Sequence, residues 1–92
     1  MRMVEAFEML EDGSSSPVVI ARADLNSNCV YCIVDEPSKS VYLWIGKEAP
    51  VRKRFVGAQT ASRIRQEQGS GFRVRSIDQG YEDKNFYDSL NL

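Results

Sequence analysis

Two short segments of the chain are apolar at nearly every position, which predicts two strands in the middle of a β-sheet. The segments cover residues 30–34 and 41–45. A strand that is apolar on both faces must be covered on both sides. The turn-rich segment 35–40 lies between them, so an antiparallel hairpin is the simplest pairing.

The segment that follows predicts a long helix from about Ala49 to Gln68. Pro50 suits the first helical position, where its missing N–H is not needed. Gly69 suits the left-handed position just after the last turn. Gly57 lies in the middle, where the absence of a side chain would let the helix approach the sheet closely. The face expected to pack on the sheet holds Gly57, Ala61 and Ile64.

Weaker patterns predict the elements around this unit. Residues 2–10 read as a strand, with a short helix as the alternative, and residues 18–21 read as a strand, with a polar turn at 11–17 between them. Residues 72–77 begin with true alternation of apolar and basic side chains, which is typical of a half-exposed edge strand. Residues 82–90 have the apolar spacing of a short closing helix, with Glu82 and Asp83 expected to cap it.

These elements predict an α+β fold. A central mixed sheet of about five strands would be sandwiched between one long and one short helix, because sheet strands covered on both faces need a layer on each side. The chain has 92 residues, so we expect residues 1–92 to form a single domain.

Composition excludes several functions. The chain has no histidine and only two cysteines, Cys29 and Cys32, so histidine-based catalysis and a four-thiolate metal site are both ruled out. Residues three apart on a strand point to opposite faces, so we expect two structural thiols rather than a redox pair. We expect no enzymatic activity. No apolar run is long enough to span a membrane and no signal peptide is evident, which predicts a cytoplasmic protein.

The net charge of −1 conceals an uneven distribution. Residues 46–76 carry eight basic and two acidic side chains, a net charge of +6, so the remainder carries −7. This basic block could bind an anionic surface such as a phosphoinositide or another acidic lipid. No aromatic residues are interleaved on its basic face, so we expect no nucleic-acid binding. The candidate residues for anionic-surface binding are Lys53, Arg54, Arg65, Arg73 and Arg75.

Three segments in order carry a resemblance to a known family. They are the asparagine-rich turn and strand 24–31, the segment Val-Tyr-Leu-Trp-Ile-Gly-Lys at 41–47, and the helix end with its glycine turn at 63–71. Together they resemble the gelsolin homology domain of the gelsolin, villin and severin family, and most of all its second repeat, in a single-domain form. The family fold, a mixed sheet between a long and a short helix, agrees with the elements predicted above.

The resemblance implies actin binding through the exposed face of the long helix. In the family's first repeat an aliphatic residue lies at the centre of this face. The matching residue here is the polar Gln59, so the apolar contact would be weaker, with Phe55 and Val56 as substitutes in a partly exposed patch. The face is basic and actin is largely acidic, which would raise the encounter rate more than the affinity. The matching positions are Arg52, Phe55, Val56, Gln59, Arg63 and Gln66.

The resemblance also implies calcium sites, but the matching residues are poor ligands. The family uses a backbone carbonyl and an aspartate before the strand and a glutamate in the long helix; Asn28, Cys29 and Lys53 stand there. An aspartate of a second site falls near Arg65. Calcium is a hard cation that binds oxygen atoms, so the thiol of Cys29 and the positively charged Lys53 and Arg65 are poor ligands for it. We therefore expect no cofactor and no metal site. The oxygen ligands that keep calcium as an alternative are Asp24, Asp35, Asp78, Glu82 and Asp83.

The resemblance as a whole implies a cytoplasmic, cytoskeleton-associated module that modulates assembly of actin or an actin-like filament, independently of calcium. Sequestering, capping or side binding is expected, and efficient severing is not, because a single domain lacks the gain from linked binding sites. Two alternatives stay open. One is a protein-interaction module without actin, as in vesicle-coat proteins, and the other is the anionic-lipid-binding domain described above.

Overall fold

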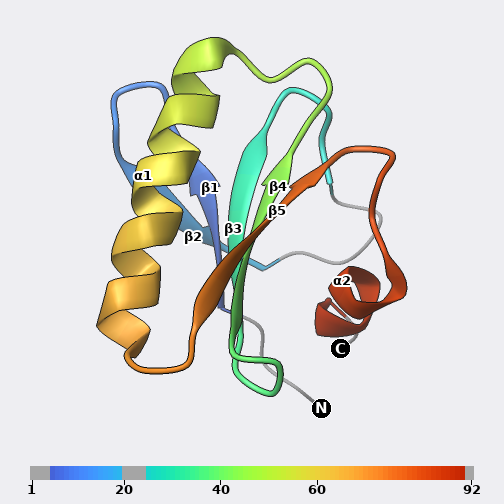
Figure 1. Ribbon diagram of the computed structural model, residues 1–92. Coiled ribbons are helices and arrows are strands. Elements are labelled where there is room, and N and C mark those ends of the chain that lie inside the picture. Colours follow the sequence, from blue (N-terminus) through green and yellow to red (C-terminus); the bar gives the residue numbers. More distant parts are fainter. Residues whose placement is uncertain (1–4, 20–24, 91–92) are drawn as a thin grey trace.

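The structure is a computed structural model that describes residues 5–19 and 25–90. Within these residues, a five-stranded sheet separates one long helix from one short helix (Figure 1). The α+β sandwich predicted from the sequence is therefore confirmed. Neither described helix combines the length and hydropathy that a membrane crossing requires. The elements are β1 (Glu5–Met9), β2 (Ser15–Val18), β3 (Val30–Asp35), β4 (Ser40–Ile45), α1 (Val51–Gln68), β5 (Arg73–Asp78) and α2 (Lys84–Ser89).

The sheet has the order β2-β1-β3-β4-β5, and the two continuous apolar strands lie at its centre. β3 and β4 form the predicted antiparallel hairpin, in which Val30 pairs with Ile45 and Asp35 with Ser40. β5 pairs with β4 in parallel, while the other described pairs are antiparallel, so the sheet is mixed. β5 is an edge strand, as its alternating pattern predicts.

Each face of the sheet carries its own core. The face toward α1 buries Val30, Leu43 and their neighbours against the helix. The opposite face buries Trp44, Tyr42 and Phe86, and the rings of Tyr42 and Phe86 meet edge to face with centroids 5.5 Å apart. Because consecutive side chains alternate between faces, one apolar strand supplies both cores.

Gly57 sets how closely α1 approaches the sheet. A Cβ at this position would lie 2.7 Å from Val30 Cγ1 and 2.9 Å from Leu43 Cδ1, which is closer than van der Waals contact allows. The helix begins at Val51, with Pro50 as the N-cap rather than the first helical residue. Gly69 follows the helix with a φ of 96° and a ψ of −159°, a positive-φ conformation that glycine adopts readily, rather than the left-handed helical conformation predicted for it.

The edges of the molecule differ from the prediction. β2 begins at Ser15, inside the segment expected to be a turn, and the prediction of a strand at 18–21 is correct only at its start; residues 20–21 lie outside the described residues. The reversal is tighter than expected, because the N–H of Leu10 donates to the carbonyl of Ser14 and Asp12 accepts from the N–H of Ser14. Pairing with β1 thus extends β2 into polar sequence, since backbone hydrogen bonds form regardless of side chain.

Candidate protein-binding surface

α1 has one buried and one exposed face. Its buried face packs on the sheet through Val56, Gly57, Thr60, Ala61 and Ile64. The opposite face is open to solvent along the whole helix. Of the six residues proposed from the resemblance, five lie on that exposed face: Arg52, Phe55, Gln59, Arg63 and Gln66.

The predicted exposure of Val56 is wrong. Its side chain is only 7% exposed and belongs to the core between α1 and the sheet. Successive helical residues are about 100° apart, and the buried face of α1 begins at Val56, so Phe55 lies just outside that face. Gly57 packs closely against the sheet. The neighbouring Val56 therefore faces the core, and Phe55 lies on the exposed side of α1.

An apolar patch lies at the start of this face. Phe55 is 62% exposed and Val51, one turn earlier, is 80% exposed. The candidate binding residues predicted from the sequence do not include Val51, although its spacing of four residues places it on the same helical face as Phe55. The patch borders an open groove of about 610 Å³, lined by Gly13, Val51, Arg52, Phe55, Val56 and Gln59.

The groove lies between α1 and the turn that joins β1 to β2. Arg52 Nε donates a hydrogen bond of 2.6 Å to the carbonyl of Glu11, which fixes this turn against the helix. A second hollow, of about 350 Å³, is lined farther along α1 by Arg63, Ile64 and Glu67 and by Phe7 and Ser15 of the sheet. The exposed face of α1 is therefore flanked by concave surface along much of its length.

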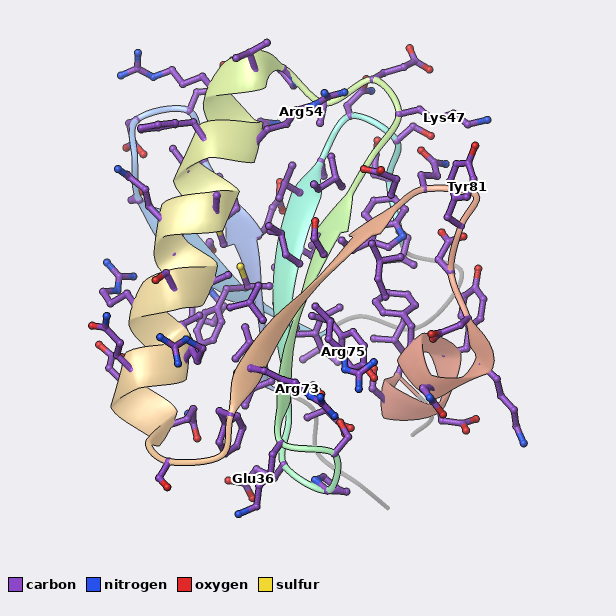
Figure 2. The ribbon with its side chains drawn as sticks, viewed as in Figure 1. Glu36, Lys47, Arg54, Arg73, Arg75 and Tyr81 are labelled. Atoms are coloured by element: carbon purple, nitrogen blue, oxygen red, sulfur yellow. The ribbon has the colours of Figure 1, made fainter. Side chains whose placement is uncertain are left out.

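The five residues proposed for anionic-surface binding do not share one face. Arg54 and Arg65 are exposed on α1. Arg75 pairs with Tyr42 across the parallel ladder, which places it on the α2 side of the sheet, and Figure 2 shows it beside α2. Arg73 pairs with Ser40 and lies on the same side. The basic block, continuous in sequence, is divided by the sheet.

Lys53 has a specific partner. Its Nζ donates to the backbone carbonyl of Asn28 at 3.3 Å, in the loop before β3. An ammonium group at this carbonyl does not fit a calcium ion there. No group of three or more acidic or cysteine side chains that could hold a metal occurs in residues 5–19 and 25–90, and Asp24 lies outside them.

The two thiols lie on opposite faces of the sheet, as predicted. Cys32 is fully buried under α1, where its Sγ donates to the carbonyl of Gly57 at 3.7 Å. Burial raises the pKa of Cys32 to about 12, although the positive charge of Arg63 lowers it slightly. Cys29 packs on the other core, with its Sγ 3.5 Å from Glu8 Oε2. Cys32 is thus protonated and inert at neutral pH.

One exposed aromatic residue was not predicted as a candidate. Tyr81 is 84% exposed in the turn between β5 and α2 (Figure 2). The turn is held in place because the N–H of Tyr81 donates to the carbonyl of Asp78 and Gly80 N–H donates to Glu82 Oε1. The sequence places Tyr81 in a turn but does not show that its side chain is exposed.

Comparison with known proteins defines the class of this fold. No protein-family model matches the chain, and no curated protein matches its sequence. Among solved structures, a chain of the Thorarchaeota ProGel/rabbit actin complex has 29% identity and a TM-score of 0.89, and the match covers 97% of this chain and 100% of that one. The Thorarchaeota 2DGel3/rabbit actin complex has 23% identity and a TM-score of 0.85, over 96% of this chain and 45% of the other.

The arrangement is therefore that of the gelsolin-like class of small α+β domains. The resemblance read from the three sequence segments is confirmed: this chain is a gelsolin-like domain.

Proposed function

We propose that this domain binds actin, or an actin-like filament protein, through the exposed face of α1. The observation that carries the proposal is the likeness to ProGel, which is matched over its whole length and whose structure is a complex with rabbit actin. The long helix, its exposed Phe55 and the adjoining groove supply the apolar surface that a protein interface needs at its centre.

The charge of the face supports the same partner. Arg52 and Arg63 lie on the exposed side of α1, and Arg54 lies near them. Basic residues at the rim of an interface steer an acidic partner toward it and increase the association rate more than the affinity. We therefore expect actin binding whose association rate falls as the salt concentration rises.

We also propose that residues 1–92 act as one domain with one contact to actin. A single contact gains nothing from the linkage that multiplies affinity when two sites are joined. Monomer sequestration, end capping or side binding is therefore the expected effect on assembly, without efficient severing. An actin partner implies a cytoplasmic, cytoskeleton-associated location and a role without catalysis.

An actin assembly assay tests the proposal. The domain in excess should change the polymerisation time course, and it should either lower the amount of filament or sediment with it. The assay is run with calcium and with a chelator, and we expect the same result in both. An unchanged time course together with no binding to monomer or filament would overturn the proposal. A homodimer that buries Phe55 and Gln59 would instead favour an interaction module without actin.

A further inference from the structure

In the loop at residues 26–29, the carbonyl of Asn26 accepts within the loop, and the other three backbone carbonyls accept from the turn after β4 and from the start of α1. Each of the four carbonyls accepts a hydrogen bond from a donor within the chain. Three of these donors are backbone N–H groups, at distances of 2.9–3.0 Å. The carbonyl of Asn28 differs, because it accepts from the side chain of Lys53. The three backbone pairs are Cys29 to Asn26, Glu48 to Ser27 and Gly46 to Cys29.

The position of Lys53 in its helix is unfavourable without this partner. Lys53 lies in the first turn of α1, which contains no acidic residue. The N-terminal end of a helix carries a partial positive charge and disfavours cations. Lys53 is half-buried, so solvent screens its charge less than that of the exposed Arg54 beside it. A carbonyl oxygen placed at the ammonium group offsets both costs.

We propose that the ammonium group of Lys53 is a built-in cation that fastens α1 to the loop before β3, in the place where the resemblance predicts calcium. Calcium takes six to eight oxygen ligands. Here the carbonyl of Asn28 is already paired with a cation, and the next residue is the thiol of Cys29 rather than a carboxylate. The junction between helix and loop is therefore closed at any calcium concentration.

A charge reversal at Lys53 tests this inference. Lys53→Glu removes the donor and places a carboxylate next to the carbonyl of Asn28. Arg54→Glu is the matched control, since it makes the same change of charge one residue later in the same helical turn, where the side chain is exposed. The helix dipole affects both variants alike, so the difference between their melting temperatures reports the contact of Lys53 with the loop.

Thermal melting is measured for both variants and the original chain, in a chelator and in millimolar calcium. In the chelator, Lys53→Glu should melt about 4–8 °C below Arg54→Glu, as expected for the loss of one partly exposed hydrogen bond from a domain of this size. Calcium should not restore that difference, because the new carboxylate and the Asn28 carbonyl, with the thiol of Cys29 still in place, supply too few of the six to eight oxygen ligands that calcium takes. The original chain and Arg54→Glu should not respond to calcium.

Either of two results would overturn the inference: equal melting of the two variants in chelator, or a calcium response in the original chain. Lys53→Met provides a second check in case the reversed charge prevents folding. It should melt below Arg54→Met and gain nothing from calcium. Because no measurement involves actin, these results are independent of the proposed function.

Discussion

Trp44 Nε1 donates a hydrogen bond of 2.8 Å to Glu82 Oε2, which links the central strand β4 to the segment ahead of α2. The sequence predicts that both acids before α2, Glu82 and Asp83, cap the helix. Asp83 does cap the helix, since its side chain accepts from the N–H of Phe86. Glu82 instead satisfies the buried indole. Burial raises the pKa of Glu82, but hydrogen bonds from Trp44 and from backbone and side-chain neighbours outweigh it and hold that pKa below its ordinary value.

Glu82→Ala should destabilise the fold by about 1–3 kcal/mol, because it leaves the indole N–H of Trp44 buried without an acceptor. Urea unfolding monitored by the fluorescence of Trp44, the one tryptophan, measures this directly. Glu82→Gln keeps an acceptor oxygen and should retain most of the stability. If the two variants unfold alike, the hydrogen bond to Trp44 does not stabilise the domain.

Alkaline pH should destabilise the domain through Cys32. The folded pKa of about 12 exceeds the ordinary value of 9.0 because burial disfavours the thiolate. The folded state therefore binds the proton more tightly. The contribution of the Cys32 thiol to stability is complete below pH 9 and is lost as the pH rises from 9 toward 12. The full loss is on the order of 4 kcal/mol.

Stability is measured by urea unfolding between pH 8 and 10.5 for the original chain and for Cys32→Ala. The variant starts less stable, because it lacks the sulfur atom, but its stability should decline less with pH. Tyr31, whose pKa burial raises to about 12, contributes to the decline of both proteins. Parallel pH curves would show that Cys32 is not the group responsible.

Gly57→Ala should destabilise the domain even though alanine is the better helix former. The added methyl group would meet Val30 Cγ1 at 2.7 Å and Leu43 Cδ1 at 2.9 Å. Overpacking of this kind costs about 1–3 kcal/mol, against a gain of about 1 kcal/mol in helix propensity. We expect a net loss of about 1 kcal/mol. Ala58→Gly, at the exposed next position, measures the propensity term alone; greater stability of Gly57→Ala than of the original chain would contradict this account.

Phe55→Ala should weaken actin binding at least tenfold while leaving the melting temperature nearly unchanged. The ring of Phe55 is 62% exposed, so its removal costs the fold little, whereas aromatic residues at the centre of an interface often dominate its affinity. Affinity for monomeric actin is measured by fluorescence titration. Tyr81→Ala is the control, because its ring is 84% exposed but lies outside the proposed face. Equal losses in both variants would place the interface elsewhere.

The sequence predicts the central hairpin, α1 and a helix on each face of the sheet, because the signals for these features are local. Continuous apolar segments identify β3 and β4, and Gly69 marks the end of α1 through its own backbone preference. The start of β2 was misplaced because its polar residues gain their strand structure from pairing with β1.

By itself, the sequence determined the fold class, the buried central strands and the helix that carries the candidate surface. Only the tertiary structure decided which of Phe55 and Val56 faces outward, because the phase of a helix is set by its contact with the sheet, here at Gly57. It also separated Arg75 from the basic residues of α1 and brought Lys53 to the carbonyl of Asn28. The partner of a charge depends on segments that are distant in sequence, and folding alone brings them together.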